Sequence, residues 1–302
     1  MSKLFGCFFP LLGRRKRHLS SDSDMDSVEE KNVVLAERED SLFKVHLLGA
    51  TLLSWKVDDA EILFVSDKAV FDNKKAIRGG IPFVFPQFGP WSAGPQHGFA
   101  RTSHWKLEKE PEKLPNGDVQ AVFTLCDSDS TRALWDYRFK VTYTITLMDK
   151  KLNMEVDVKN TGESEFSFTV LLHTYFNVPD VTKCEVTGLK GITYVDKTRN
   201  EETFLEDREV VTVAQLTDRV YQNTPSEHSI RVVAGNRTIT MRKHNFPDTV
   251  IWNPWKEKAK AMSDFGDDEY LNMICVEAGS VSNPVKLGTN QTFHASQVLE
   301  LT

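Results

Sequence analysis

Residues 138–145, RFKVTYTI, and residues 152–158, LNMEVDV, alternate apolar and polar side chains over almost their whole length. Successive side chains of a β-strand point to opposite faces of a sheet, so this alternation predicts two strands that each bury one face. The polar stretch Met148-Asp149-Lys150-Lys151 between them predicts a tight turn. Together the two segments form a predicted β-hairpin.

The same period of two extends outward along the chain in both directions. It appears in residues 43–47 and 119–123, and Gly235-Asn236 predicts a second hairpin between two apolar segments. We find no long segment with helical periodicity and helix caps, and no internal repeat. The sequence therefore predicts an all-β fold in one domain, residues 28–302, built as a large antiparallel β-sandwich of two sheets packed face to face.

The overall composition is that of an ordinary globular protein. The 302 residues are 40% hydrophobic and 26% charged, which is enough to bury a large core. The net charge of −6 argues against a nucleic-acid-binding protein. The four cysteines lie far apart and form no C-x-x-C pair, so we expect reduced thiols in a cytoplasmic protein, and no metal site.

Residues 1–27 differ from the rest of the chain. An apolar run at residues 4–12 precedes the basic run Arg14-Arg15-Lys16-Arg17, and serine alternates with aspartate beyond it. The apolar run is too short to span a bilayer, and the order of charge is wrong for a secretory signal. We expect a disordered tail; the alternative is a weak membrane tether through the apolar and basic runs, with a lipid on Cys7.

Two stretches rich in glycine and proline stand apart from the strand pattern. They are residues 78–90, RGGIPFVFPQFGP, and residues 97–101, HGFAR. Glycine and proline in such density predict tight turns of the backbone. Aromatic side chains in and near these turns could cover the C–H faces of a sugar: Phe85, Phe88, Trp91 and Phe99.

The polar residues of the same stretches suit a small anion. The guanidinium groups of Arg78 and Arg101 can each hold a phosphate through two parallel charged hydrogen bonds. The amide of Gln96 and the imidazole of His97 add further polar groups beside them. The alternative is a surface loop whose arginines pair with neighbouring acids.

His173 and Glu277 are the candidate acid–base residues. In residues 166–177, FSFTVLLHTYFN, the even positions are mostly apolar, so strand alternation places His173 on the more polar face. In residues 273–279, MICVEAG, Glu277 lies at the end of an apolar strand, where partial desolvation would make it a stronger base. On residue type alone, both side chains could instead be structural.

Several motifs, in chain order, resemble the aldose 1-epimerase (galactose mutarotase-like) superfamily, and within it the hexose-6-phosphate mutarotases. The matching segments are residues 78–89, 97–101, 172–176 (LHTYF), 217–221 (TDRVY), 252–255 (WNPW) and 276–279 (VEAG). The resemblance begins near residue 33 and continues to the C-terminus. It implies a large β-sandwich of the galactose mutarotase-like type, with a sugar site on a concave sheet and no metal.

The resemblance also implies the roles of individual residues. It makes His173 the catalytic acid and Glu277 the catalytic base of a reaction that interconverts α and β anomers. The substrate-binding positions that it implies are Arg78, Gln96, Arg101 and Asp218, with His97 as a further member.

The residue types agree with that reaction. Opening an aldohexose ring needs a base for the anomeric hydroxyl and an acid for the ring oxygen, and closure reverses the two roles. Glu277 and His173 can supply both groups without a cofactor or a covalent intermediate. Glycoside hydrolysis normally uses two carboxylates, which a His/Glu pair matches less well. The resemblance, with which this chemistry agrees, implies an isomerase that acts on a hexose 6-phosphate, and we expect glucose 6-phosphate as the substrate.

Three alternatives remain open on the sequence. They are a hydrolase or lyase on the same scaffold, a mutarotase of unphosphorylated aldoses, and a non-catalytic protein that binds or senses sugar phosphates. An intact His/Glu pair argues against the last, because a sensor does not need both groups. We expect a cytoplasmic monomer whose partner is a small sugar phosphate, with no nucleic acid and no cofactor.

Overall fold

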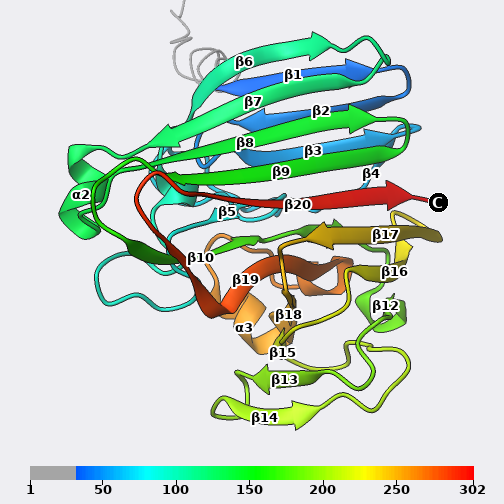
Figure 1. The fold of residues 1–302 in the computed structure, drawn as a ribbon. Coiled ribbons are helices and arrows are strands. Elements are labelled where there is room, and N and C mark those ends of the chain that lie inside the picture. Colours follow the sequence, from blue (N-terminus) through cyan, green and yellow to red (C-terminus); the bar gives the residue numbers. More distant parts are fainter. Residues whose placement is uncertain (1–31) are drawn as a thin grey trace, which may run out of the picture. The chain divides into compact units, whose positions relative to one another are not determined.

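The computed structural model describes residues 32–302 and confirms the predicted all-β class. Its strands form one four-stranded and two eight-stranded sheets (Figure 1). Within each sheet, neighbouring strands pair antiparallel. The predicted tail, residues 1–27, and the alternative of a membrane tether lie outside the described residues. Within the described range, no helix is long and apolar enough to cross a membrane.

We call the eight-stranded sheet that contains Glu277 the front sheet and the other the back sheet. The front sheet contains, in spatial order, β14 (Glu202–Leu205), β13 (Thr193–Asp196), β15 (Thr217–Tyr221), β18 (Asp248–Asn253), β19 (Met273–Leu287), β10 (Phe166–Leu172) and β5 (Phe83–Val84), with β11 (Tyr175–Asn177) also paired to β19. The back sheet contains β12 (Glu185–Val186), β16 (Glu227–Val233), β17 (Arg237–His244), β20 (Thr292–Leu301), β9 (Lys151–Asn160), β8 (Phe139–Met148), β7 (Val119–Cys126) and β6 (Lys106–Lys113).

The remaining elements are short. The four-stranded sheet contains β1 (Val33–Arg38), β2 (Ser41–His46), β3 (Thr51–Val57) and β4 (Ala60–Glu61). The helices are α2 (Asp129–Leu134), α3 (Trp255–Ala261) and the 3₁₀ turns η1 (Ala100–Thr102), η2 (Val181–Lys183) and η3 (Glu269–Asn272). The expectation that no long helix occurs is confirmed for the described residues.

Both predicted hairpins are present. β8 and β9 pair from Phe139 opposite Asn160 down to Met148 opposite Lys151, and each strand alternates buried and partly exposed residues. β16 and β17 pair around the turn at residues 234–236, with a shift of register between Arg231 and Val233. The alternation that the sequence displays therefore marks the buried face of these strands correctly.

The sheets pack through aromatic side chains. Phe168 of the front sheet lies 5.6 Å from Phe293 of the back sheet, and Phe83 meets Tyr143 edge-on at 5.3 Å, measured between ring centroids. Such edge contacts between buried rings add to the stabilisation from burial of apolar area. The large predicted sandwich is thereby confirmed.

The four-stranded sheet is a third sheet, which the sequence did not predict. It lies against β6, β7 and β8 of the back sheet (Figure 1). Isolated bridges link the neighbouring segments, with Leu52 of β3 opposite Ile81, just before β5, and Leu63, just after β4, opposite Phe176 of β11. Alternation identifies strands but does not say which sheet each strand joins, so this arrangement could not be read from the sequence.

The segment 166–177 is not the single strand that its alternation predicts. The ladder ends at Leu172 and resumes at Tyr175, and the Thr174 N–H donates to the Leu172 carbonyl at 2.9 Å. The His173 N–H donates instead to the carbonyl of Pro82 at 3.1 Å. This break lets the chain between β10 and β11 turn, with both ends still paired to β19.

Two glycines explain the composition of the turning segments. Gly80 (φ +66°) and Gly98 (φ +73°) adopt left-handed backbone conformations, and a Cβ on either would lie 2.1 Å from the Leu52 carbonyl oxygen or 2.2 Å from that of Phe85. Any other residue would be strained and would collide with backbone. These two close approaches hold the segment that carries Arg78 against β3 and the segment that carries His97 and Arg101 against the end of β5.

Candidate active site

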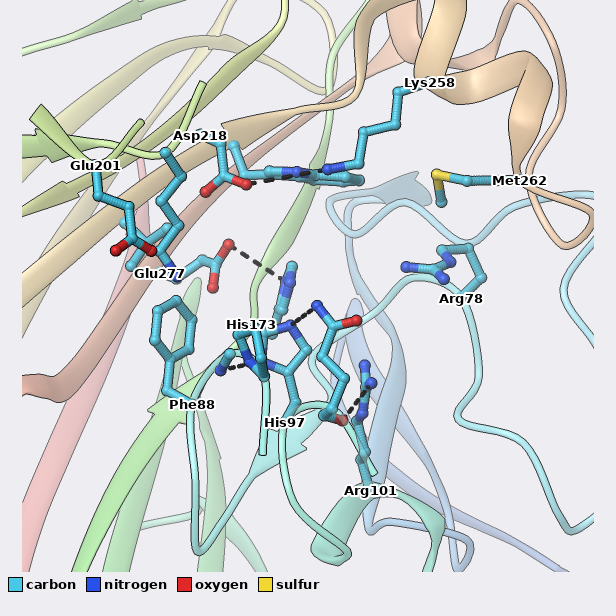
Figure 2. Close-up of a pocket in the computed structure, with 16 residues that line it drawn as sticks. Arg78, Phe88, His97, Arg101, His173, Glu201, Asp218, Lys258, Met262 and Glu277 are labelled. Carbon is cyan, nitrogen blue, oxygen red and sulfur yellow. Dashed lines mark hydrogen bonds and ion pairs between the residues drawn. The ribbon is translucent and has the colours of Figure 1, made fainter. Parts of the chain in front are cut away.

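A cavity of about 380 Å³ opens over the front sheet and its connections. It is lined by all seven residues that the sequence singled out: Arg78, Gln96, His97, Arg101, His173, Asp218 and Glu277. They come from segments as far apart in the chain as residues 78 and 277, and the fold alone gathers them (Figure 2). The predicted set therefore forms one site, while the role of each member is a proposal argued below.

His173 and Glu277 meet in the middle of this cavity. Nδ1 of His173 lies 3.4 Å from Oε1 of Glu277, and the two side chains are only 10% and 1% exposed. The pairing of Leu172 with Ala278, together with that of Tyr175 with Cys275, brings His173 beside Glu277. Glu277 does not end its strand as the sequence suggested, because β19 continues to Leu287.

The surroundings shift the proton affinities of this pair in opposite directions. Burial lowers the pKa of His173 well below its usual value, and the nearby positive charges of Arg101 and Arg78 lower it further. Burial raises the pKa of Glu277 well above its usual value, and the nearby Asp218 adds to the effect. Without a ligand, the site therefore favours the neutral forms of both side chains.

His173 is also held by aromatic neighbours. Its ring stacks on Tyr175 with centroids 4.8 Å apart and an interplanar angle of 14°, and it meets Trp252 edge-on at 6.0 Å. His173 and Tyr175 therefore lie on the same side of the chain, as the alternation of residues 166–177 predicted, although the strand is broken between β10 and β11. These contacts fix the plane of the imidazole, which a proton transfer to a defined atom requires.

Arg78 and Arg101 form the cationic end of the cavity. Nε and Nη2 of Arg78 both lie 3.2 Å from Oδ2 of Asp264, and Nη1 donates to the Tyr175 hydroxyl at 3.3 Å. Arg101 donates from Nη2 to the Gln96 carbonyl at 2.8 Å, and its buried Nε has no partner among residues 32–302. The sequence left open a surface loop whose arginines pair with neighbouring acids. Arg78 has such a partner, and Arg101 does not.

The electrostatics of Arg101 point to an anion. Burial lowers the pKa of this guanidinium to about 10, and the charge of Arg78 contributes to the same effect. A buried cation without a carboxylate partner is costly unless a ligand supplies the counter-charge. Arg101 therefore marks the position at which a negatively charged group would be stabilised most.

His97 lies between the arginines and His173. Its backbone has φ +67°, and its Nδ1 accepts a hydrogen bond from the Gly89 N–H at 3.1 Å. Burial and the nearby cations, Arg101 first, lower the pKa of His97 to about 3, so the ring is neutral at physiological pH. With Nδ1 as acceptor, the proton of the neutral ring lies on Nε2, and this N–H can donate to the Gln96 side chain only when the amide turns its oxygen toward the ring, because the atom 3.4 Å away is the amide nitrogen.

The opposite end of the cavity is acidic. Asp218 and Glu201 line it beside Glu277, and burial raises the pKa of Asp218. Lys258 Nζ lies 4.0 Å from Asp218 Oδ2. Figure 2 shows the arginines on one side of His173 and these carboxylates on the other. The cavity therefore has two ends of opposite charge with the His/Glu pair between them.

Comparison with known proteins bears on the site as a whole. Residues 31–300 match the family model described as aldose 1-epimerase. The chain belongs to the aldose 1-epimerase family. This membership confirms the predicted superfamily and, with it, the predicted class of enzyme: the protein is an isomerase of the mutarotase type. The non-catalytic alternative loses its support.

Relatives of this mutarotase cover most of its length. A protein of Cenchrus ciliaris named "Putative glucose-6-phosphate 1-epimerase" is 38% identical over 264 residues, which is 85% of this chain and 80% of the relative. A protein of Escherichia coli K12 with the same name is 33% identical over 296 residues, 97% of this chain and 94% of the relative. A crystal structure from Salmonella typhimurium is titled as that of "a putative mutarotase". It superposes on this chain with a TM-score of 0.82 at 30% sequence identity, and the match covers 89% of this chain and 90% of the other.

Several lining residues of this mutarotase were not identified as site residues from the sequence. They are Lys197, Glu201, Trp252, Lys258 and Met262. Trp252 stands in one of the motifs, WNPW, and that motif is the one signal that could have found it. The others come from a hairpin turn and a helix and follow no pattern in the sequence.

The predicted aromatic lining is partly wrong. Phe85 and Phe99 are buried in the main core, and Trp91 packs against that core instead of lining the cavity. Of the four named, Phe88 lines the cavity, where Lys197 Nζ lies 4.4 Å from its ring centroid. Phe85 and Phe99 meet edge-on at 6.0 Å, so they support the turning segments from beneath.

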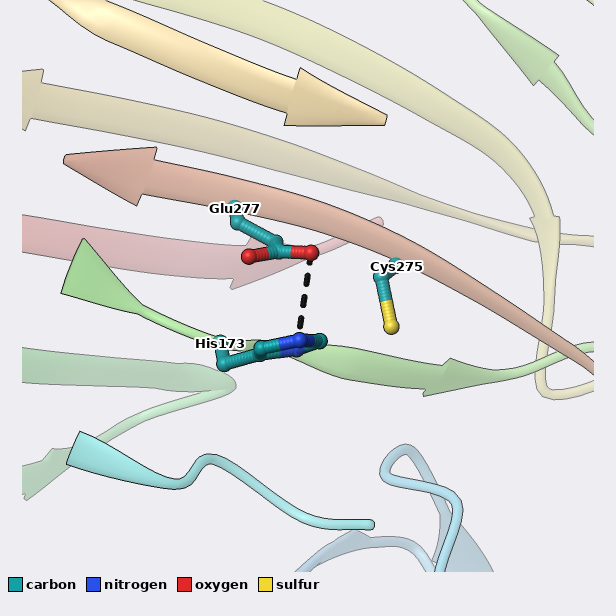
Figure 3. A group of neighbouring side chains, drawn as sticks. All are labelled: His173, Cys275 and Glu277. Atoms are coloured by element: carbon teal, nitrogen blue, oxygen red, sulfur yellow. Dashed lines mark ion pairs between the residues drawn. The ribbon is translucent and has the colours of Figure 1, made fainter. Parts of the chain in front are cut away.

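One group in this site has the donor types of a metal centre. His173, Cys275 and Glu277 each offer one ligand atom, and these atoms lie within 4.8 Å of one another (Figure 3). Two of the three are the candidate acid and base. Cys275 lies beneath them and is fully buried.

Proposed function

We propose that this mutarotase interconverts the α and β anomers of a hexose 6-phosphate, and that glucose 6-phosphate is its substrate. The observation that carries the proposal is the order of groups across the cavity: Glu277, then His173, then the two arginines. In the sugar, the anomeric hydroxyl and the ring oxygen are both bonded to C1, and the 6-phosphate extends beyond the ring oxygen through C5 and C6. The two orders match.

The acid–base steps follow from this placement. Glu277 accepts the proton of the anomeric hydroxyl while His173 donates a proton to the ring oxygen, and the bond between C1 and the ring oxygen breaks to give the open-chain aldehyde. Rotation about the C1–C2 bond presents the other face of the aldehyde. Closure then returns the proton from the C5 hydroxyl to His173 and one from Glu277 to the new anomeric oxygen.

The charges near each member of the pair support these two roles. The groups that act on His173 include Arg101 and Arg78, whereas the carboxylate that acts on Glu277 is Asp218. A phosphate dianion on the arginines would cancel much of the positive charge that lowers the pKa of His173. The substrate would thereby favour movement of the proton from Glu277 to His173, which leaves the base ionised and the acid protonated.

The remaining predicted residues have proposed roles in binding. Arg78 and Arg101 bind the phosphate, and the neutral His97 with Gln96 contributes hydrogen bonds beside it. Asp218 accepts hydrogen bonds from sugar hydroxyls at the acidic end. Phe88 and Trp252 cover the apolar faces of the ring. The names of the curated relatives support the choice of a phosphorylated hexose.

The proposal includes a monomeric, cytoplasmic enzyme. All seven predicted site residues come from one chain, so a second subunit is not needed to complete the cavity. The three cysteines of the described range are free thiols, which suits a reducing compartment.

NMR saturation transfer or polarimetry with the purified protein tests the proposal. Exchange between the anomers of glucose 6-phosphate should be fast compared with that of glucose and galactose at equal concentration. A His173→Asn variant is the control for exchange that the protein does not catalyse. Equal rates with glucose and glucose 6-phosphate would instead identify a general aldose mutarotase and reject the phosphate-specific function.

A further inference from the structure

Strand geometry places a thiol beneath the proposed acid–base pair. Cys275 and Glu277 are two residues apart in β19, so their side chains point to the same face of the strand. His173 joins them from the turn between β10 and β11. Figure 3 shows the three side chains converging on a common space, and their ligand atoms lie within 4.8 Å of one another.

Buried atoms without partners converge on that space. Nδ1 of His173 and Oε2 of Glu277 are buried and make no hydrogen bond to any residue from 32 to 302. Cys275 is 0% exposed, and burial raises the pKa of its thiol well above the usual value, so the metal-free thiol keeps its proton. A sugar hydroxyl can satisfy the histidine and the carboxylate from the cavity. The thiol does not line the cavity, so its placement is not explained by the sugar.

The donor set and its spacing suit a particular class of cation. Zinc takes nitrogen, sulfur and oxygen ligands in a tetrahedron, with neighbouring ligand atoms about 3.3–3.7 Å apart for its usual bond lengths. The 3.4 Å between Nδ1 and Oε1 already matches, and the sulfur would need to approach by roughly an ångström. The hard cations Mg²⁺ and Ca²⁺ prefer sites built from oxygen.

We propose that His173, Cys275 and Glu277 form an inhibitory site for Zn²⁺ and similar thiophilic divalent cations. Binding releases the protons of the thiol and of the Glu277 carboxyl group to solvent and occupies the imidazole lone pair and the carboxylate, so neither is free to move protons for the sugar. The effect on rate rests on the proposed roles of His173 and Glu277, whereas binding of the metal does not.

Cobalt spectroscopy of the substrate-free, full-length protein tests binding without an assay of activity. Co²⁺ should produce a sulfur-to-metal charge-transfer band in the near ultraviolet together with the visible bands of a tetrahedral site. Cys275→Ala should abolish the charge-transfer band. Cys184→Ala is the matched control, because Cys184 is a buried thiol that donates to the Arg231 carbonyl, away from this group. Absence of the band in the wild type, or its survival in Cys275→Ala, overturns the site.

Inhibition by ZnCl₂ tests the consequence. Zinc should slow anomer exchange, EDTA should restore it, and MgCl₂ should have no effect. Cys275→Ala should keep its metal-free rate and need at least roughly tenfold more zinc for the same inhibition, since losing even an outer-shell partner costs that much affinity. Cys184→Ala should behave as wild type.

Three results would contradict the inhibitory role. Equal zinc sensitivity in Cys275→Ala would place the metal elsewhere. Loss of activity when EDTA is added to untreated enzyme would make the metal a requirement instead of an inhibitor. A cobalt band that depends on Cys275, without any change in rate, would confirm the metal site but reject the proposed roles of His173 and Glu277.

Discussion

At the arginine end of the cavity, Arg101 has no carboxylate partner among the described residues, whereas at the acidic end Asp218 has Lys258 Nζ 4.0 Å away. Burial lowers the pKa of Arg101 to about 10 and raises that of Asp218, so each group is pushed toward its neutral form. At the arginine end Arg78 is paired with Asp264, so Arg101 is the group that lacks a counter-charge among the described residues. The difference indicates that the arginine end requires a charged ligand, while the acidic end can bind a neutral one.

The comparison assigns different consequences to the two ends. Loss of an arginine should affect substrates that carry a phosphate, and loss of a group at the acidic end should affect all aldoses. Loss of His173 or Glu277, which lie between the two ends, should lower the rate most, and should do so for every substrate. The predictions below test this division in order of expected effect.

Replacement of either member of the pair should have the largest effect. Glu277→Gln and His173→Asn each remove a proton-transfer group and should slow anomer exchange by about 10²–10⁴-fold, for glucose 6-phosphate and for glucose alike. The double variant should be little slower than the slower single variant, because the two groups act together. Saturation-transfer NMR measures the rates, and a near-normal rate in either variant removes that residue from the reaction.

Arg101→Ala should weaken turnover of glucose 6-phosphate by about 10–100-fold in kcat/KM, as expected for loss of a charge-assisted hydrogen-bond pair. The slow turnover of glucose should change much less. Arg101→Lys should recover only part of the loss, because an ammonium lacks the planar fork of a guanidinium. Equal damage to both substrates would show that Arg101 holds the loop or the ring, and the division between the two ends would fail.

Arg78→Ala should show the same selectivity with an additional structural effect. Removal of this guanidinium leaves Asp264 without its ion-pair partner. We therefore expect a loss of about 10–100-fold for glucose 6-phosphate together with a small decrease in melting temperature. Asp264→Asn is the control, since it should reproduce the change in stability with a smaller change in selectivity. If both variants lose selectivity equally, Asp264 and not Arg78 sets the phosphate preference.

Asp218→Asn should have a smaller effect that is equal for both substrates. It weakens hydrogen bonds to sugar hydroxyls, which corresponds to a loss of about 2–10-fold. It also removes a charge that raises the pKa of Glu277. In a site that favours protonated Glu277 and neutral His173, loss of the Glu277 proton sets the alkaline limb of the rate profile, so the lower pKa should move that limb to lower pH. A shift to higher pH would contradict this electrostatic link.

The weakest expected effect concerns the acidic limb. The charge of Arg101 lowers the pKa of His173, so Arg101→Ala should raise that pKa. In the substrate-free site protonation of His173 beside protonated Glu277 sets the acidic limb of kcat/KM for glucose, so that limb should move to higher pH. Glucose is the probe because it brings no charge of its own. An unchanged limb would separate the arginine end from the proton-transfer step.

Strand alternation and local motifs predicted different parts of this molecule. The β8–β9 hairpin could be read directly because each strand buries one face, and alternation records that face residue by residue. The two arginines, Gln96 and His97 were found in or beside segments rich in glycine and proline, where tight turns require particular residues. His173 and Glu277 were found from strand patterns, and Asp218 from the family resemblance alone. Lys197 and Lys258 were missed because a long side chain reaches the cavity from outside any motif. The break after Leu172 was missed because alternation continues across it.

Glu277 lies on a strand that is hydrogen-bonded on both sides, to β18 and to β10, whereas Arg78, His97, Arg101 and Lys197 lie on connections between strands. Connections tolerate insertion and substitution far better than a central strand does. Lineages that share this fold could therefore change the sugar they accept by altering loops, with the base held in place. Divergence in substrate choice would then proceed without rebuilding the reaction centre, and laboratory evolution toward new aldoses should begin in those loops.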